Sequence, residues 1–299
     1  MELLLRLPCT LLESLRQMAH CDIMRQNQDS ACRRGEKVME VIIKSDKLEA
    51  GKLGAKIIAR LIRDKAKAVL GLATGSTPLA LYKELVRMHR EESLSFKNVT
   101  TFNLDEYVGL DPSHPCSFYS EMHKNLFSQL DLAKGASHLP DGMAQDLPAS
   151  CAAYEAAIKV AGGIDLQLLG IGHDGHLAFN EPGSSLASRT RLKTLSQKTI
   201  KANSRFFGSE DKVPRHVVTM GLGTIMEARQ CVLLAFGRDK AEAVRDMIEG
   251  PVSASCPGSV LQFHEKTIVL LDPEAAGKLK RKQYYLDVYA GKPAWQLWD

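Results

Sequence analysis

Short runs of apolar and β-branched residues alternate along the chain with longer segments whose apolar residues recur at helical spacing. The strand-like runs are residues 41–43, 68–72, 99–102, 166–171, 217–220, 232–236 and 268–271. The helical segments are residues 48–62, 79–86, 151–160, 241–248 and 273–280. Such alternation is typical of a doubly wound, mostly parallel sheet with helices on both faces. We therefore predict a single α/β domain, whose ligand binds beyond the carboxyl ends of the strands.

The first strand follows an N-terminal extension. Residues 1–38 open with an apolar stretch that Arg6 and Glu13 interrupt, and no small-residue cleavage site follows, which disfavours a secretory signal. The acidic residues of this segment also disfavour an organelle transit peptide. We expect residues 1–38 to lie outside the fold, residues 39–287 to form the domain and residues 288–299 to form a tail. Met39 begins MEVIIKSD, which reads as the first strand.

The composition limits which kinds of partner the protein is expected to bind and in which compartment it is expected. The formal net charge is only +4, and no dense basic run occurs, which disfavours nucleic acid as a partner. The seven cysteines are odd in number and include no C-x-x-C pair, a pattern typical of reduced thiols in the cytoplasm. No apolar run approaches the roughly 20 residues of a membrane span. We expect a cytoplasmic protein with neither nucleic acid nor membrane as a partner.

A glycine-containing turn follows the second strand-like run. Residues 70–77 read LGLATGST, and Pro78 suits the first turn of the next helix, where its missing N–H is not needed. Gly75 allows a ligand to approach the backbone, and free N–H groups with the hydroxyls of Ser76 and Thr77 would face an anion. No G-x-x-x-x-G-K occurs, so a nucleoside triphosphate is not implied. From the residues alone, a phosphate site and a capped turn without a ligand are equally good interpretations.

Two later loops concentrate titratable side chains. The first, FNLDEYVGL at residues 102–110, places Asp105 just after a strand, where a carboxylate could remove a proton from carbon. The second, GIGHDGHLAFNEP at residues 170–182, holds five polar residues within nine positions: His173, Asp174, His176, Asn180 and Glu181. Asp174 and His176 are two apart, so in an extended loop they point the same way. A carboxylate beside an imidazole fixes the tautomer of the ring, which suits acid–base catalysis.

Two other interpretations of the second loop stay open. His, Asp and Glu are also metal ligands, but H-D-G-H does not match H-E-x-x-H, and its glycine disfavours a helical ligand pair. A polar turn with a capping Asp explains one such residue well and five poorly. We therefore favour a carboxylate–histidine site without a metal.

In these segments the chain resembles the glucosamine-6-phosphate deaminase (isomerising) family. The shared motifs are, in order, LGLATGSTP, VTTFNLDEYVGL, HPCSFY, GIGHDGHLAFNEPGSSLASRTRLKTL, ANSRFF and GRDKAEA. One such motif is weak evidence, whereas several in the same order are specific. The resemblance implies a Rossmann-like α/β fold of the kind found in that family, and no cofactor. It implies conversion of glucosamine 6-phosphate and water to fructose 6-phosphate and ammonia.

The resemblance also assigns roles to residues. Asp105 is similar to the base that moves a proton between C2 and C1, and His176 to the group that assists ring opening. Asp174 and Glu181 are similar to the carboxylates that support this histidine. The residues expected to hold the substrate phosphate are Gly75, Ser76, Thr77, Arg205 and Lys240. Without the resemblance, Arg205 and Lys240 would be read as ordinary exposed cations.

The resemblance also implies a regulatory site. Hexameric, allosteric members of the family bind N-acetylglucosamine 6-phosphate at subunit boundaries. The residues that match their pattern are Ser184, Ser185, Arg191, Lys193 and Thr194. These two hydroxyls and two cations would suit an anion, and the alternative is a polar loop leading into a strand. We therefore expect a homohexamer with this effector site.

The chain departs from the family pattern at two places. His173 stands where the family usually has Asn or another small polar residue, and the tail at 288–299 does not match.

Two other functions are possible for a chain with these motifs. A 6-phosphogluconolactonase has a related G-x-G-x-D-G-H loop, but this chain continues L-A-F-N-E-P and carries N-L-D-E-Y. A sugar-phosphate-sensing regulator would need a DNA-binding helix-turn-helix, which residues 1–38 do not convincingly supply.

Overall fold

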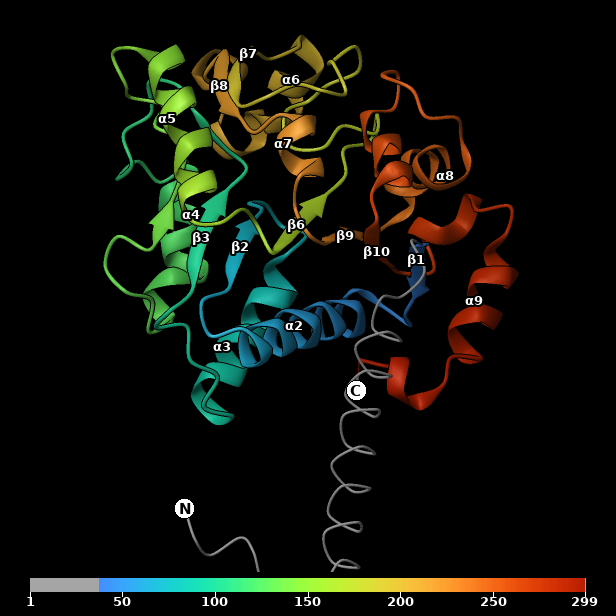
Figure 1. The fold of residues 1–299 in the computed structure, drawn as a ribbon. Coiled ribbons are helices and arrows are strands. Elements are labelled where there is room, and N and C mark those ends of the chain that lie inside the picture. Colours follow the sequence, from blue (N-terminus) through green and yellow to red (C-terminus); the bar gives the residue numbers. More distant parts are fainter. Residues whose placement is uncertain (1–37, 299) are drawn as a thin grey trace, which may run out of the picture. The chain divides into compact units, whose positions relative to one another are not determined.

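The computed structural model describes residues 38–298, which are built around a seven-stranded sheet (Figure 1). Its strands lie in the order β1 (Val38–Ile43), β10 (Lys266–Leu271), β9 (Cys231–Ala235), β6 (Leu166–Gly170), β2 (Val69–Leu72), β3 (Thr100–Asn103) and β5 (Ser137–His138). Each neighbouring pair is parallel. The predicted α/β fold with a parallel sheet is confirmed.

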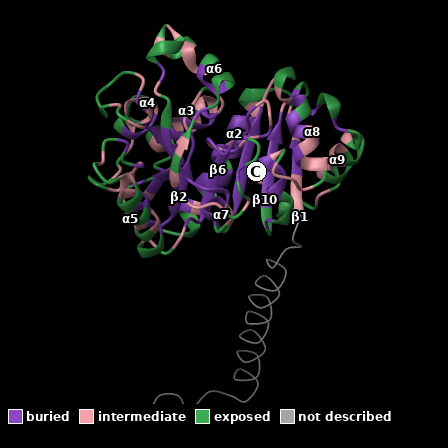
Figure 2. Ribbon diagram, turned by 90° about the horizontal axis from the view of Figure 1, so that it is seen from above, coloured by how far each residue is buried: buried purple, intermediate pink, exposed green. Residues whose placement is uncertain are grey.

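Alternate strand residues contact helices on opposite faces of this sheet. In β6, Leu166 and Leu168 pack into a buried cluster with α2 (Lys47–Asp64) and α3 (Leu79–Glu91). The side chain of Leu169, the residue after Leu168, faces the other cluster instead. The helices that contribute to this second cluster are α5 (Leu147–Val160), α7 (Leu222–Met226) and α8 (Ala241–Glu249). The strands are therefore buried on both faces, as their continuous apolar runs predict, and Figure 2 shows them between the outer helices.

Helix α2 fixes the position of α3 by close contact between the two backbones. Its N-cap is Asp46, whose side chain accepts hydrogen bonds from two N–H groups of the first turn. A Cβ added at Gly51 would lie 2.9 Å from that of Ala80, and one at Gly54 would lie 2.6 Å from Leu81. Small residues on α2 thus allow the first turn of α3 to pack tightly, just after the glycine-containing turn of the sequence.

A second, antiparallel sheet differs from the prediction. It contains β4 (Asp105–Tyr107), β8 (His216–Thr219) and β7 (Arg191–Thr194) in that order. The sequence pattern had placed residues 217–220 in the parallel sheet, because apolar runs do not reveal which strand is their partner. One residue, Leu104, separates β4 from β3. Asp105 therefore begins a strand of the second sheet directly after a strand of the first.

Some helices and turns of the structure were not predicted from the spacing of apolar residues. Four helices were not anticipated: α4 (Phe118–Asn125), α6 (Gln197–Phe207), α7 and α9 (Lys282–Ala290). Short 3-10 turns occur at Phe127–Gln129, Glu210–Lys212, Arg238–Lys240, Pro257–Phe263, Ala275–Lys278 and Ala294–Gln296. The predicted helix at 273–280 is one of these turns. The described chain contains no helix with the length and apolarity to cross a membrane.

The C-terminal segment contacts the first strand. Helix α9 continues past residue 287, the predicted end of the domain, and Lys292 forms an ion pair of 2.5 Å with Glu40 of β1. The predicted extension at 1–38 lies outside the described residues except for Val38, which begins β1.

Candidate active site

The predicted catalytic residues and most of the predicted phosphate-binding residues follow four neighbouring strands of the parallel sheet. These strands are β9, β6, β2 and β3, in that order, and the segments after them carry Lys240, residues 171–181, residues 73–78 and Asp105. Parallel strands lie about 4.8 Å apart, so the ends of β6 and β3 are separated by roughly 10 Å. That separation suits two groups that act on one six-carbon ligand. The sheet thus gathers these segments along one edge, as the sequence predicts.

Asp105 is a buried carboxylate that has no stabilising partner in the part of the chain that the structure describes. Only 5% of the residue is exposed, and no described side chain or N–H donates a hydrogen bond to its carboxylate. Burial raises the pKa of this carboxyl well above its usual range, and the nearby charges of Glu106 and Glu121 raise it further. A carboxylate with a raised pKa is a stronger base, which suits proton abstraction from carbon.

The neighbouring Glu106 is engaged by the backbone. Its carboxylate accepts hydrogen bonds from the N–H groups of Tyr107, Phe118 and Tyr119, at 2.9, 3.1 and 2.9 Å. Phe118 and Tyr119 form the first turn of α4, so Glu106 joins this helix to β4. The D-E pair therefore contains one structural carboxylate and one that is free for chemistry, a distinction that the sequence alone did not show.

Thr219 connects Asp105 to the loop of the predicted histidine. It lies opposite Asp105 in the β4–β8 pairing, and its Oγ1 accepts a hydrogen bond of 3.1 Å from the N–H of Phe179. Thr219 is fully buried, so water does not compete for this hydrogen bond. Sequence reasoning missed Thr219, since only the strand pairing reveals it.

His176 and Asp174 form the predicted carboxylate–imidazole pair. The Nδ1 atom of His176 lies 2.6 Å from Oδ1 of Asp174, which also accepts the backbone N–H of His176 at 3.3 Å. Burial alone would raise the pKa of Asp174, but the hydrogen bond and charge of His176 hold it well below its usual range. An ionised carboxylate only accepts, so Nδ1 carries the proton and Nε2 is left to exchange protons with a ligand.

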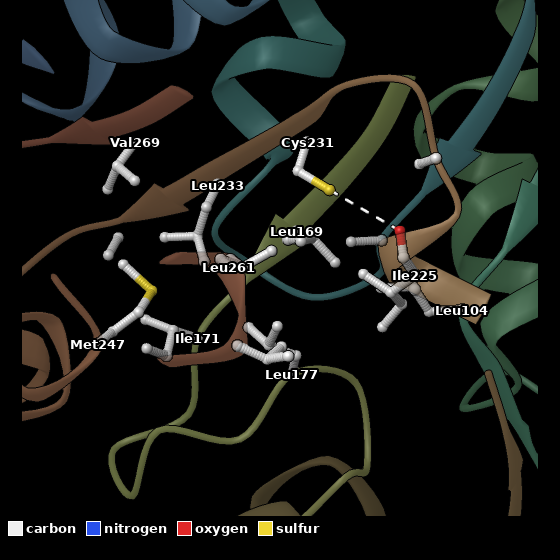
Figure 3. Close-up of a cluster of buried hydrophobic side chains, with 14 of the residues drawn as sticks. Leu104, Leu169, Ile171, Leu177, Ile225, Cys231, Leu233, Met247, Leu261 and Val269 are labelled. Atoms are coloured by element: carbon white, nitrogen blue, oxygen red, sulfur yellow. Dashed lines mark hydrogen bonds between the residues drawn. The ribbon is translucent and has the colours of Figure 1, made fainter. Parts of the chain in front are cut away.

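Glycine holds the turn around this pair. The N–H of Gly172 donates to the carbonyl oxygen of His176 at 2.9 Å, and Gly175 has a φ of +82°. A Cβ at Gly172 would lie 2.2 to 2.4 Å from three atoms of the His176 ring. On either side of the turn, Ile171 and Leu177 point into the buried cluster of Figure 3. Gly172 therefore leaves the space that the imidazole occupies.

Glu181 accepts hydrogen bonds from the start of α6. Its Oε1 accepts from the hydroxyls of Ser196, at 2.5 Å, and Thr199, and both of its oxygens accept the N–H of Ser196. Ser196 is the N-cap of α6. No hydrogen bond or ion pair within the described residues joins Glu181 to His176. The support of His176 by Glu181 stays a prediction, while the observed contacts fix the start of the helix that carries Arg205.

The turn at residues 73–78 has the features expected of an anion-binding loop. Gly75 has a φ of +99°, a conformation that side chains rarely adopt, and a Cβ there would meet no atom within 4 Å. The hydroxyls of Ser76 and Thr77 form no hydrogen bond with another described residue, and α3 begins after Pro78. The N–H of Gly75 is not free, because it donates to Oε1 of Glu121 at 2.8 Å. Sequence reasoning missed Glu121, which lies on the unanticipated helix α4.

The two predicted phosphate-binding cations lie in different surroundings. Lys240 is half-buried, 3.8 Å from the carboxylate of Asp239, and its charge helps to lower the pKa of His173. Lys240 is thus close to the histidine loop. Arg205 is exposed on α6, with its guanidinium 4.7 Å from the ring centroid of Phe206. No contact within the described residues joins Arg205 to Lys240 or to residues 75–77, so its role stays a prediction.

His173, the departure from the family pattern, lies beside His176. The ring centroids are 6.3 Å apart and the rings are nearly perpendicular. Burial lowers the pKa of His173, against the charge of Asp174, which raises it. Its Nε2 is buried and has no hydrogen-bond partner among the described residues.

The residues of the predicted effector site are partly brought together. Arg191 and Lys193 alternate along β7 and so share one face, while Thr194 points to the other, where its Oγ1 lies 3.3 Å from Nδ1 of His216. Ser184 is buried and its Oγ has no partner among the described residues, whereas Ser185 is exposed. No described contact joins these serines to the two cations. The effector site therefore stays a prediction.

Metal ligands are not clustered in residues 38–298. No group of three or more His, Cys, Asp or Glu side chains in this part of the chain is arranged to hold a metal ion.

Comparisons with known proteins place these features in a family. A family model described as glucosamine-6-phosphate isomerases/6-phosphogluconolactonase matches residues 47–270. A glucosamine-6-phosphate deaminase of Arthrobacter sp. (strain FB24) is 54% identical over 258 residues, which are 86% of this chain and 99% of that protein. One of Mycolicibacterium smegmatis is 56% identical over 259 residues, again 86% and 99% of the two chains.

Solved structures agree with this assignment. A glucosamine-6-phosphate deaminase described as monomeric is 44% identical, with a TM-score of 0.79 over 80% of this chain and 100% of that chain. A 6-phosphogluconolactonase from Trypanosoma brucei is 22% identical, with a TM-score of 0.64 over 81% of this chain and 99% of that chain. At that identity the second likeness shows the fold alone.

Proposed function

Because the chain belongs to the glucosamine-6-phosphate deaminase family, we propose that it converts glucosamine 6-phosphate and water to fructose 6-phosphate and ammonia. One observation carries the chemistry. An unpaired buried carboxylate, Asp105, and an imidazole oriented by Asp174, His176, follow strands β3 and β6 at the same edge of the sheet. The reaction needs a base at carbon and a proton carrier at the sugar ring, and these two groups match those needs.

Ring opening is the step assigned to His176. Opening a pyranose removes a proton from the anomeric hydroxyl and delivers one to the ring oxygen. With Nδ1 hydrogen-bonded to Asp174, the Nε2 atom can accept the first proton and return it to the ring oxygen. The product is the open-chain amino aldehyde, in which the hydrogen on C2 is acidic.

Isomerisation and deamination follow at Asp105. The carboxylate removes the proton from C2 and returns it to C1, which converts the amino aldehyde through an enolamine to the imine of the ketose. Water then adds to C2 of the imine, and the C2–N bond breaks as ammonia leaves with a proton. The products are fructose 6-phosphate and ammonia, so atoms and electrons balance without a redox partner.

The phosphate is assigned to the loop after β2, with Gly75, Ser76 and Thr77, and to Lys240 and Arg205. Support comes from the unpartnered hydroxyls of Ser76 and Thr77 and from the position of Lys240 after β9, which adjoins β6. Binding at this end of the substrate would place its carbon chain along the sheet edge, toward the base and the imidazole.

Lys240→Gln is expected to weaken binding more than turnover. Loss of one charge-assisted hydrogen bond to phosphate removes about 1.5–3 kcal/mol, so KM for glucosamine 6-phosphate should rise about 10- to 100-fold while kcat changes little. The matched control is Arg238→Gln, on the same 3-10 turn but exposed. Equal KM values in wild type and Lys240→Gln would remove Lys240 from the phosphate site.

Gly172→Ala tests the space that the imidazole needs. The added methyl group would overlap the ring of His176, so the ring must move, and a displacement of about 1 Å can lower turnover about 100-fold. The control is Gly170→Ala on β6, where a Cβ meets nothing within 4 Å. Measurement of kcat/KM and thermal unfolding for both variants separates a local displacement from a loss of folding. Wild-type kcat/KM in Gly172→Ala would contradict the observed ring position.

A substrate panel separates the proposed reaction from its rivals. Wild-type protein is incubated with glucosamine 6-phosphate, galactosamine 6-phosphate and 6-phosphogluconolactone, and ammonia, fructose 6-phosphate and lactone hydrolysis are each measured. The expected result is equal amounts of ammonia and fructose 6-phosphate from the first substrate. Lactone hydrolysis without ammonia would support a lactonase, and binding of sugar phosphate without turnover would support a regulator.

The finer points of assembly and compartment are part of the same proposal. We propose a cytoplasmic homohexamer that binds N-acetylglucosamine 6-phosphate at Ser184, Ser185, Arg191, Lys193 and Thr194. The motif match supports the effector site, and the free thiols of the four described cysteines suit a reducing compartment. A relative that is 44% identical is described as monomeric, so assembly needs a direct test.

Sedimentation and kinetics together supply that test. A hexamer is expected by analytical ultracentrifugation, and N-acetylglucosamine 6-phosphate is expected to lower the substrate concentration at half-maximal rate. Lys193→Gln should abolish this activation and leave the maximal rate unchanged. Monomers at all protein concentrations, or a response to effector that survives in Lys193→Gln, would contradict the assignment.

A further inference from the structure

A carboxylate occupies part of the loop that is assigned to phosphate. Oε1 of Glu121 accepts the N–H of Gly75 at 2.8 Å, and Gly75 is the glycine whose left-handed conformation shapes the loop. This N–H points at an anion, and in the absence of substrate the anion is a side chain of the protein itself. Carboxylate and phosphate oxygens compete for the same N–H donors.

Helix α4 holds Glu121 in this position. The side chain of Ser117 caps the helix by accepting the N–H of Ser120 at 3.0 Å, and Glu106 accepts two further N–H groups of its first turn. On the next turn, Met122 is buried in the cluster that α2 and α3 share. The contact between Glu121 and Gly75 thus joins two fixed elements.

The charge of Glu121 has no basic partner within the described residues. No lysine, arginine or histidine of residues 38–298 forms an ion pair with it, and its one hydrogen-bond partner there is the N–H of Gly75. Its half-buried carboxylate also acts on its surroundings, because it helps to raise the pKa of Tyr82 beside the loop. An anionic ligand at Gly75 therefore meets a negative charge that no cation of residues 38–298 pairs with.

We propose that Glu121 is a specificity-determining residue whose carboxylate occupies the Gly75 N–H and must be displaced by the substrate phosphate, so that it sets the affinity of the loop for phosphate. The inference rests on the proposed function in one respect: residues 75–77 hold the phosphate. Release of the side chain and like-charge repulsion both weaken binding. Without the Glu121 carboxylate, the loop would bind phosphate more tightly than it does in the wild-type protein. A ligand with a lower negative charge than phosphate is repelled less by Glu121, so it loses less affinity.

Three variants separate this role from simple support of the loop. Glu121→Gln removes the charge but keeps an oxygen that can accept the Gly75 N–H, while Glu121→Ala removes both. Glu91→Gln is the matched control, since it removes one negative charge at the far end of α3, about 18 Å along the helix from the loop. A fourth variant, Ser76→Ala, reports whether the bound anion lies in this loop.

Binding of inorganic phosphate is measured by isothermal titration calorimetry for the full chain and each variant. The dissociation constant is expected to fall about five- to tenfold in Glu121→Gln and at least as far in Glu121→Ala, and to stay unchanged in Glu91→Gln. Ser76→Ala should weaken phosphate binding. KM for glucosamine 6-phosphate should fall in parallel in the two Glu121 variants.

Two results would overturn the proposal. If Glu121→Ala binds phosphate more weakly while Glu121→Gln equals wild type, Glu121 supports the loop and does not compete with the ligand. If phosphate binds with equal affinity to wild type and to both Glu121 variants, or binds to none of them, this carboxylate does not compete with phosphate for the loop. Because calorimetry needs no turnover, tighter phosphate binding without ammonia release would uphold the inference and reject the proposed function.

Discussion

Asp105→Asn is expected to lose at least about 10²–10⁴-fold in kcat for ammonia release, the range that general bases contribute. Asn has nearly the same shape but cannot accept a proton from C2. In D₂O, wild-type protein should introduce deuterium at the C2 and C1 positions that exchange during isomerisation, and the variant should not. Asn at this position should still bind substrate, so KM should change far less than kcat.

The same substitution is expected to stabilise the fold at neutral pH. The pKa of Asp105 is raised in the folded protein by burial and by Glu106 and Glu121, so folding favours the protonated form. As the pH rises above the pKa of the unfolded chain, the buried charge destabilises the fold, and this penalty is complete above the folded pKa. Removal of the charge should add about 1–3 kcal/mol at pH 7.5, and the gain should vanish near pH 3. Thermal unfolding at the two pH values measures both effects.

Glu106→Gln is the control for this stability change. It alters the adjacent carboxylate, but one that accepts three backbone N–H groups. The amide offers one acceptor oxygen and places an NH₂ group against an N–H donor. The free energy of unfolding should therefore fall by about 1–3 kcal/mol. Lower stability in Asp105→Asn than in wild type at pH 7.5 would contradict the description of Asp105 as an unpaired buried charge.

The raised pKa of Asp105 also predicts the acidic limb of activity. The base acts only when deprotonated, so kcat/KM should fall as the pH drops through its pKa. The charges that raise the pKa of Asp105 are those of Glu106 of β4 and Glu121 of α4. Its own charge in turn helps to raise the pKa of two largely buried phenols, Tyr107 of β4 and Tyr154 of α5. Since Glu121 raises the pKa of Asp105, Glu121→Gln should move the acidic limb of the pH profile to lower pH.

His176→Gln is expected to show the second large effect, a loss of about 10²–10⁴-fold on the closed-ring substrate. Glutamine cannot carry a proton between the anomeric hydroxyl and the ring oxygen, but Asp105 is intact and can still act on an open chain. The variant should therefore depend on spontaneous ring opening. At high concentrations of His176→Gln, the rate should stop increasing with the amount of enzyme, whereas the wild-type rate should stay proportional to it.

Asp174→Asn provides the comparison for this experiment. It removes the charge that holds Nδ1–H of His176 at 2.6 Å, so it should reduce the rate in the same direction but leave some catalysed ring opening. If the rate of His176→Gln stays proportional to enzyme at every concentration, His176 does not open the ring.

The sequence predicted the parallel sheet because both faces are covered, which leaves apolar runs such as residues 232–236 that only a buried strand explains. It predicted one site because loops after parallel strands meet at one edge. Pairing and side-chain contact were not readable in the same way. The pattern of residues 217–220 did not reveal an antiparallel partner, and the D-E pair did not reveal which carboxylate the backbone of α4 engages.

The sequence motifs also did not reveal the hydrogen-bond partners of individual side chains. The motif around Glu181 did not show that its oxygens accept hydrogen bonds from Ser196 and Thr199, because those residues meet it only where the chain returns at the start of α6. Glu121 was not singled out at all, since its hydrogen-bond partner Gly75 is 46 positions away. Contacts of that sequence separation depend on the assembled fold and not on any local pattern.

The proposed reaction depends on removal of the C2 proton of an aminated sugar phosphate by Asp105. This step is tested by NMR of glucosamine 6-phosphate in D₂O with wild-type protein and with Asp105→Asn, together with an assay for ammonia. We expect wild-type protein to release ammonia and fructose 6-phosphate in equal amounts with deuterium exchange, and the variant to do neither. Wild-type exchange in Asp105→Asn, or no ammonia from the wild-type protein, would contradict this proposal.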